Sequence, residues 1–112
     1  MVPILVVDDE SLIRWSLAES LEGQGFTVLE AGSACEALAC LDQHSDIAVV
    51  LLDLKLPDST DLTLLRRLRR LAPTSRVILM TAHGTAEILD EAVRAGAFRA
   101  VGKPFDVEEM VA

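Results

Sequence analysis

The sequence is poor in the features that mark disordered or membrane-spanning chains. Its 112 residues include 4 prolines, 6 glycines and no tyrosine, whereas 51% are hydrophobic. This composition argues against intrinsic disorder and predicts one compact globular domain. The longest strictly apolar run, residues 47–52, has six residues, far fewer than the roughly 20 that a membrane-spanning helix needs. No secretory signal pattern opens the chain, so neither export nor membrane insertion is expected.

Cysteine is also scarce. Cys35 and Cys40 lie five positions apart on one predicted helix, a spacing that suits neither a CxxC pair nor an obvious disulfide. We therefore expect two reduced thiols in a cytoplasmic protein.

Basic residues are nearly absent from the first half of the chain. Residues 1–53 hold ten acidic side chains against Arg14 alone, a balance of −9, whereas residues 54–112 hold eight against nine, a balance of +1. The acidic half would repel a nucleic-acid backbone and attract a hard cation. The sequence predicts no direct nucleic-acid contact for this domain.

Short apolar runs alternate with segments of helical spacing. Strands are expected at residues 3–8, 26–31, 47–53, 76–81 and 98–101. Helices are expected at residues 11–22, 33–41, 62–71 and 86–95, with a last, shortened one beginning near Asp106. Ser33 and Glu36 form a capping box at the second helix. This alternation of strands and helices predicts a doubly wound α/β domain: a five-stranded parallel sheet with helices on both faces.

Polar residues follow four of the predicted strands. Asp8 and Asp9 follow the first strand and Asp53 ends the third; Thr81 ends the fourth, and Lys103 follows the fifth. In this fold class, ligands bind at the carboxyl ends of the strands. Three carboxylates meeting there would repel one another unless a divalent cation, Mg²⁺ or Mn²⁺, lay between them. A lysine and a hydroxyl supply donors for an anion. The set predicts phosphoryl transfer to an aspartate.

These residues, in this order, resemble the receiver domain of bacterial two-component response regulators. The resemblance rests on Asp8-Asp9, Asp53, Thr81-Ala82 and Lys103-Pro104-Phe105, and it covers essentially the whole chain. It implies the flavodoxin-like strand order 2-1-3-4-5. Residues 13–15 (IRW) and 80–87 (MTAHGTAE) are most similar to the nitrogen-regulation type, which activates sigma-54 promoters.

The resemblance also implies roles for single residues. Asp53 would accept the phosphoryl group, and Thr81 and Lys103 would contact it. Asp9, Asp53 and the main-chain carbonyl of Lys55 would bind the metal directly, with Asp8 acting mainly through water. Lys55 and His83 would set the phosphoryl lifetime. Such a domain is a phosphoacceptor that assists its own phosphorylation and dephosphorylation, not an enzyme in the ordinary sense.

The implied partners are a sensor histidine kinase and an output domain of the same full-length protein, with transcription as the expected output and a homodimer left open. Residues 1–112 would be the receiver, with its last helix truncated and its output domain absent from this chain. No membrane contact is expected.

Two departures from the family pattern leave a second interpretation of the function possible. Ala100 stands where many receivers have Tyr or Phe, and Asp61 replaces a typical glycine. A receiver-like interaction module that no longer switches is therefore an alternative. A phosphatase or flavin carrier on the same fold is disfavoured, because residues 53–55 read Asp-Leu-Lys rather than DxD and no Ser/Thr-rich phosphate loop follows the first strand.

Two surface features receive ordinary interpretations. Arg66, Arg67, Arg69 and Arg70, between the leucines of one predicted helix, are interpreted as a solvated face. Trp15 and the three phenylalanines are interpreted as packing residues.

Overall fold

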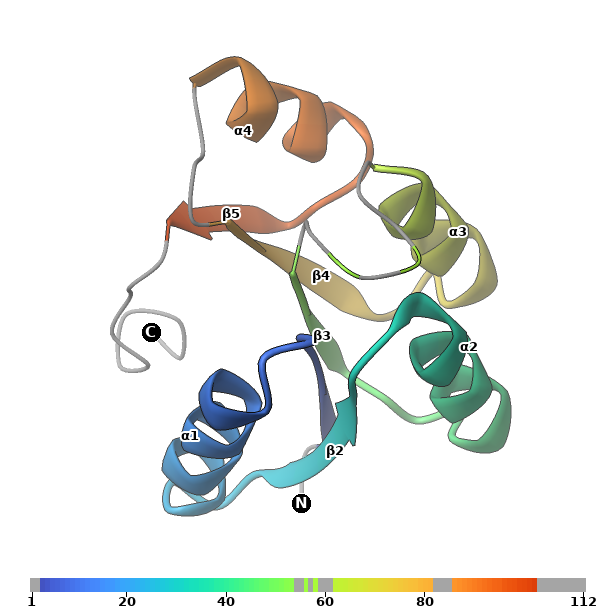
Figure 1. Cartoon of the computed structure of the whole chain (residues 1–112). Coiled ribbons are helices and arrows are strands. Elements are labelled where there is room, and N and C mark those ends of the chain that lie inside the picture. The colour runs from blue at the N-terminus through green and yellow to red at the C-terminus, as the bar shows by residue number, and fades with distance from the viewer. Residues whose placement is uncertain (1–2, 54–55, 57, 59–61, 82–85, 103–112) are drawn as a thin grey trace.

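The computed structural model describes residues 3–53, 56, 58, 62–81 and 86–102, and these form a layered α/β domain (Figure 1). The strands are β1 (Pro3–Val7), β2 (Thr27–Ala31), β3 (Val49–Asp53), β4 (Arg76–Thr81) and β5 (Arg99–Gly102). The helices within this part of the chain are α1 (Ser11–Glu22), α2 (Ala34–Gln43), α3 (Thr63–Leu71) and α4 (Ala86–Arg94). The shortened helix expected near Asp106 lies outside the described residues.

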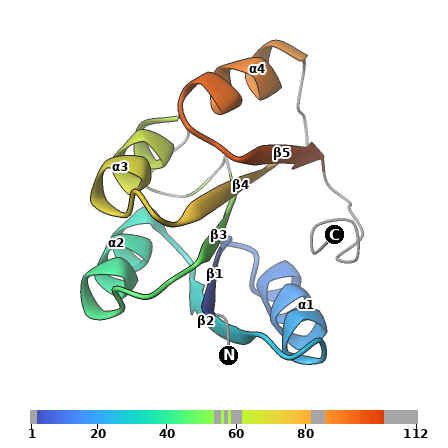
Figure 2. The same ribbon diagram turned by 180° about the vertical axis from the view of Figure 1, so that it is seen from behind.

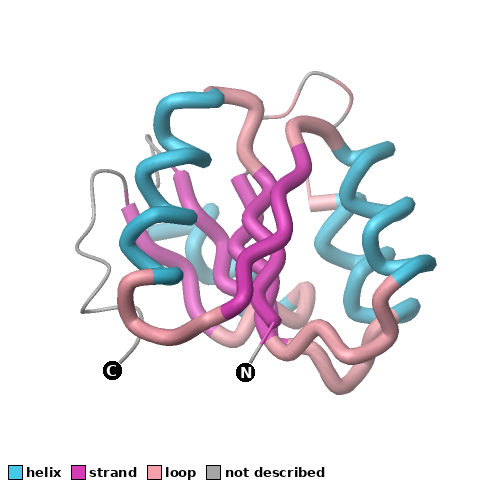
Figure 3. Tube along the Cα trace, turned by 90° about the horizontal axis from the view of Figure 1, so that it is seen from below, coloured by secondary structure: helices cyan, strands magenta, loops and turns pink. Residues whose placement is uncertain are grey.

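All strand pairs are parallel, and the strand order is β2-β1-β3-β4-β5. This confirms the predicted fold class and strand order. Helix α1 covers one face of the sheet, and α2 and α3 cover the opposite face, as the views from behind and below show (Figures 2 and 3).

Two apolar cores result, one on each face of the sheet. Leu5 and Val7 of β1 face the core that α2, α3 and α4 complete, whereas Ile4 and Val6 face the core that α1 completes. Successive side chains of a strand point to opposite faces, so a strand covered on both sides must be apolar throughout. Burying each such side chain contributes roughly 1.5–3 kcal/mol.

The start of α2 follows the predicted capping pattern. The Ser33 side chain accepts a hydrogen bond from the Glu36 amide, with 3.1 Å between Oγ and N. The Glu36 carboxylate accepts one from the Gly32 amide, at 2.5 Å, one residue further back than in the usual box. Ser33 is thus the N-cap, and the helix itself begins at Ala34.

Strand β3 begins two residues later than its apolar run suggests. Ile47 is buried, but its carbonyl accepts a hydrogen bond from the Ser75 hydroxyl at 2.5 Å. The sheet pairing with β4 starts at Val49 and Arg76. Ile47 is therefore apolar because it packs in the core, not because it extends the strand.

The aromatic residues were predicted to pack, and for two of them this is wrong. Trp15 on α1 is 57% exposed, and Phe98 is 54% exposed. The Arg76 guanidinium lies 4.6 Å from the centre of the Phe98 ring, and this cation–π contact accounts for an exposed ring at that position. Phe26 does pack against the core under α1.

The arginines of α3 are not uniformly solvated. Arg66, Arg67 and Arg70 are exposed, as expected. Arg69 is half-buried, and its Nη1 donates a hydrogen bond to the Ser75 main-chain oxygen at 2.5 Å. Arg69 therefore connects α3 to the chain that enters β4.

Both cysteines are free thiols, as predicted: Cys35 is exposed and Cys40 is partly buried. Burial, and secondarily the negative charge of Glu36, raises the pKa of the Cys40 thiol. In the part of the chain that the structure describes, no helix has the length and hydrophobicity needed to cross a membrane.

Candidate functional site

Three of the predicted site residues lie at the carboxyl edge of the sheet. Val7 pairs with Leu52, so Asp8 and Asp53 come next along the neighbouring strands β1 and β3. Asp53 pairs with Met80, and Thr81 is the next residue of β4. All three are buried, with exposed fractions of 0% for Asp8, 7% for Asp53 and 3% for Thr81. The parallel register thus brings together residues far apart in the sequence.

A cluster of carboxylates lies at the end of β1. Asp8, Asp9 and Glu10 each place one carboxylate oxygen within 4.8 Å of the others. Asp8 is buried, whereas Asp9 and Glu10 are exposed. The sequence predicted Asp8 and Asp9 but did not assign Glu10 to the metal, although it directly follows the pair. Asp53, which was assigned to it, is not a member of this cluster.

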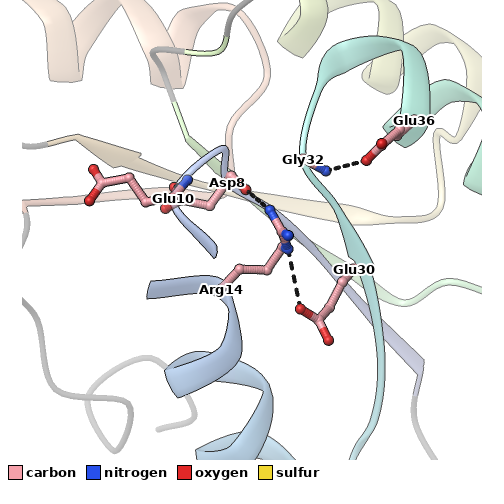
Figure 4. A network of polar contacts seen from close by, with 6 residues as sticks. All are labelled: Asp8, Glu10, Arg14, Glu30, Gly32 and Glu36. Atoms are coloured by element: carbon pink, nitrogen blue, oxygen red, sulfur yellow. Dashed lines mark hydrogen bonds and ion pairs between the residues drawn. The ribbon is translucent and has the colours of Figure 1, made fainter. Parts of the chain in front are cut away.

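The cluster is held by specific hydrogen bonds (Figure 4). The Glu10 amide donates to Asp8 Oδ1 at 2.9 Å, and the Asp8 amide donates to the Ala31 carbonyl of β2 at 3.0 Å. Arg14 Nη1 donates to the Asp8 main-chain oxygen at 2.6 Å, and its Nε donates to Glu30 Oε1 at 3.2 Å. The turn after β1 is thereby tied to both α1 and β2.

Arg14 is a residue that the motif-based prediction missed. Its guanidinium places a positive charge near the acidic cluster at the sheet edge. The same group forms an ion pair with Glu30, which connects α1 to β2. A Cβ atom at Gly32 would lie 3.1 Å from Arg14 Nη1, so the absence of a side chain there leaves room for the guanidinium. The one available signal was that Arg14 is the only basic residue among the first 53.

The remaining predicted site residues lie outside the described residues. These are Lys55, His83 and Lys103, together with Asp61 of the departures from the family pattern. Ala100 is described: it pairs with Leu79 and packs, half-buried, against the core of α2, α3 and α4.

Comparison with known proteins decides the family. Residues 4–112 match the response regulator receiver domain. The chain belongs to this family. Receiver domains are phosphoacceptor signalling domains of two-component systems rather than turnover enzymes, so the family and its general role, as predicted, are confirmed.

The relatives of this receiver domain include transcriptional regulators. The DNA-binding transcriptional regulator NtrC of Salmonella typhimurium is 38% identical over 109 residues, which are 97% of this chain and 23% of that protein. The receiver therefore spans about a quarter of the length of this relative. Sporulation initiation phosphotransferase F of Bacillus subtilis is 34% identical over 107 residues, 96% of this chain and 86% of that protein.

One solved structure of a similar protein carries the modification itself. It is a response regulator from Burkholderia pseudomallei with a phosphorylated aspartic acid, a calcium ion and citrate. It is 31% identical to this receiver, with a TM-score of 0.93, and the match covers 100% of this chain and 65% of that one.

Proposed function

We propose that this receiver is a phosphorylation-dependent switch in which Asp53 accepts a phosphoryl group from a sensor histidine kinase. The observation that carries the proposal is the buried carboxylate of Asp53 at the end of β3, with Asp8 beside it and Thr81 one residue beyond its partner on β4.

The transfer step is a substitution at phosphorus. A carboxylate oxygen of Asp53 attacks the phosphorus of a phosphohistidine, the P–N bond breaks, and the ring nitrogen keeps the bonding electron pair. The Asp53–phosphoryl bond then persists as a mixed anhydride. Thr81 and Lys103 are proposed as the hydroxyl and ammonium donors to the phosphoryl oxygens, because Thr81 ends β4 and Lys103 directly follows β5 in the sequence.

The donor set at this edge fits a divalent metal. The carboxylates of Asp8 and Asp9 in the acidic cluster, and of Asp53 at the end of β3, offer only oxygen ligands, which suit Mg²⁺ or Mn²⁺ rather than zinc. We propose that Asp8 and Asp9, together with Asp53 and the main-chain carbonyl of Lys55, hold the ion. When bound, it neutralises charge on the phosphoryl oxygens. The role of Arg14 is to keep the Asp8 main chain in place.

The proposed partners follow from the same assignment. The kinase donates the phosphoryl group in the cytoplasm, and an output domain that regulates transcription receives the conformational signal. The NtrC relative, of which this chain matches 23%, supports an output of that kind.

Ala100 favours one alternative, a receiver that binds partners without switching. Its methyl group offers no aromatic ring to rotate on activation. Titration with beryllofluoride, followed by NMR, separates the two functions. A switch shifts amide signals along β5, whereas a non-switching module binds the probe and leaves those signals in place.

Intact mass spectrometry tests the main proposal directly. After incubation with a small acyl phosphate and Mg²⁺, the wild-type chain should gain one phosphoryl group, and Asp53→Asn should gain none. A gain that persists in Asp53→Asn would refute the assigned acceptor, and no gain in the wild type would refute the function.

The lifetime roles of Lys55 and His83 are tested on the phosphorylated protein. Lys55→Ala and His83→Ala should each change the rate at which the phosphoryl group is lost. Rates equal to the wild type in both variants would remove these two residues from the proposal.

A further inference from the structure

The carboxylate of Asp58 binds the start of α2 from a distant part of the chain. Its Oδ1 accepts a hydrogen bond from the Ala34 amide at 2.8 Å, and its Oδ2 accepts one from the Cys35 amide at 3.0 Å. The partners are 24 and 23 residues away in sequence. Asp58 lies in the connection between β3 and α3, five positions after Asp53.

The contact completes the N-terminus of α2. The first amides of a helix have no intrahelical partner. Here Asp58 satisfies the first two, the Ser33 side chain satisfies the Glu36 amide, and the Ser33 carbonyl accepts from Ala37 at 3.0 Å. Of the three amides without an intrahelical partner, those of Ala34, Cys35 and Glu36, two are therefore bound by the β3–α3 connection and not by the helix's own sequence.

Asp58 makes this contact as a carboxylate, although its side chain is exposed. The hydrogen bonds from the Ala34 and Cys35 amides hold the pKa of the Asp58 carboxyl below its usual value. The positive end of the helix dipole favours a negative charge in the same place. At neutral pH the ionised carboxylate of Asp58 therefore binds the β3–α3 connection to α2.

Asp58 is one of three described anchors of the β3–α3 connection. Leu56 and Leu62 are 3% and 8% exposed and belong to the core that α2 and α3 share. Asp58 differs from these two leucines because its contact is polar: both of its carboxylate oxygens accept hydrogen bonds from amides at the end of a helix. Asp53 thus lies at the sheet edge, and Asp58, five positions later, lies at the start of α2.

We propose that Asp58 is a positioning residue for Asp53: by fixing the β3–α3 connection against α2, it sets the geometry in which the Asp53 carboxylate accepts a phosphoryl group. This inference rests on the proposed function of Asp53. Strand β3 fixes Asp53 through the sheet register, and Leu56 and Asp58 fix described points of the connection that follows it. Asp58 itself lies at α2, so it acts through the main chain.

Four variants of the full chain separate positioning from helix stabilisation. Asp58→Ala removes both acceptors, and Asp58→Asn keeps one acceptor oxygen without the charge. Ser33→Ala removes a hydrogen bond from the same helix end but leaves the β3–α3 connection attached. Asp46→Ala removes an exposed carboxylate beyond the other end of α2.

The first measurement is spectroscopic. In the wild type, the ¹H–¹⁵N signals of the Ala34 and Cys35 amides should shift as Asp58 is protonated in acid, and in Asp58→Asn this titration should disappear. If both amides titrate unchanged in Asp58→Asn, the contact on which the proposal depends is absent and the proposal fails.

The second measurement is the rate of phosphorylation by a small acyl phosphate with Mg²⁺, followed by intact mass. The acyl phosphate loses its phosphoryl group to Asp53 and leaves as a carboxylate. A misplaced reacting group loses rate steeply, so Asp58→Ala should be slower by about tenfold. Asp58→Asn should lie between it and the wild type, and Ser33→Ala and Asp46→Ala should match the wild type.

The outcomes distinguish this proposal from the function on which it rests. If the wild type gains no phosphoryl group, the function of Asp53 fails. If the wild type is phosphorylated and Asp58→Ala reacts at the same rate, Asp58 is only a helix cap and the positioning role is refuted. Equal slowing in Ser33→Ala would also refute it, because α2 stability alone would then explain the rate. Should Asp58→Ala not fold, Asp58→Asn carries the same comparison.

Discussion

Arg14 Nη1 and the main-chain oxygen of Asp8 are joined by a hydrogen bond of 2.6 Å. It connects the first turns of α1 to the end of β1, at the edge of the sheet where Asp8 and Asp53 are buried. Through Nε, the same guanidinium reaches Glu30 of β2. One basic side chain therefore fixes the turn that carries the acidic cluster.

Removing this side chain should destabilise the domain more than removing its ion-pair partner. Arg14→Ala deletes a charge-assisted hydrogen bond to the main chain and should lower the free energy of unfolding by about 1.5–3 kcal/mol. Glu30→Gln removes only the charge of a carboxylate whose side chain is 43% exposed and should cost less than about 1 kcal/mol. Urea unfolding of both variants measures the difference. Equal losses would mean that the ion pair, not the bond to Asp8, is the important contact.

Mg²⁺ should stabilise the folded chain through the acidic cluster. A ligand that binds only the folded state at 100 times its dissociation constant adds about 2.7 kcal/mol. The wild type should show this gain as a higher Tm, whereas Asp9→Asn, which lowers the negative charge of the cluster, should gain less at the same concentration. Without the ion, Asp9→Asn should be at least as stable as the wild type, because like charges repel. Glu22→Gln, at the other end of α1, is the control, and equal Mg²⁺ gains in Asp9→Asn and the wild type would contradict the assignment.

The sequence predicts most of the fold because strand and helix periods are local properties. The apolar run 76–81 coincides with β4, and Ser33 does cap α2. The buried edge residues Asp8, Asp53 and Thr81 were predicted because each ends or follows an apolar strand. In a parallel sheet this places them at one edge without any knowledge of contacts.

The contacts that span the chain could not be predicted in the same way. Asp58 and the amide of Ala34 are 24 residues apart, and no local pattern relates an exposed aspartate to a distant helix end. Arg14 could be recognised as an isolated base, but not as a donor to the Asp8 carbonyl. The exposure of Trp15 likewise depends on which side of α1 packs against the sheet. The presence of a large aromatic residue on an amphipathic helix does not determine that side.

Gly96 should tolerate alanine much less well than Gly25. Both have positive φ, +112° and +95°, where a side chain costs about 1 kcal/mol in strain. A Cβ at Gly25 meets nothing within 4 Å, but one at Gly96 would lie 2.7 Å from Cγ of Arg69. Gly96→Ala must therefore also displace Arg69, whose Nη1 binds the Ser75 carbonyl.

We expect Gly25→Ala to lower the free energy of unfolding by about 1 kcal/mol and Gly96→Ala by about 2–3 kcal/mol, since a hydrogen bond and packing are lost with the strain. Urea denaturation measures both. In the background of Arg69→Ala, the cost of Gly96→Ala should fall toward that of Gly25→Ala, because the side chain that it meets is gone. Unchanged costs in that background would show that strain alone is responsible.

The contribution of Asp58 to stability should depend on pH in a definite direction. Its carboxyl has a lowered pKa in the folded chain, chiefly because of the hydrogen bonds from Ala34 and Cys35. The unfolded chain, with an aspartate pKa of about 3.9, therefore takes up its proton first as the pH falls. The stabilisation is complete above that value and is lost as the pH falls through the folded pKa. Urea unfolding of the wild type and Asp58→Asn at several pH values between neutral and acid should show their difference shrinking in this window. A difference for Asp58→Asn that stays constant with pH would mean that the ionised carboxylate of Asp58 does not stabilise α2.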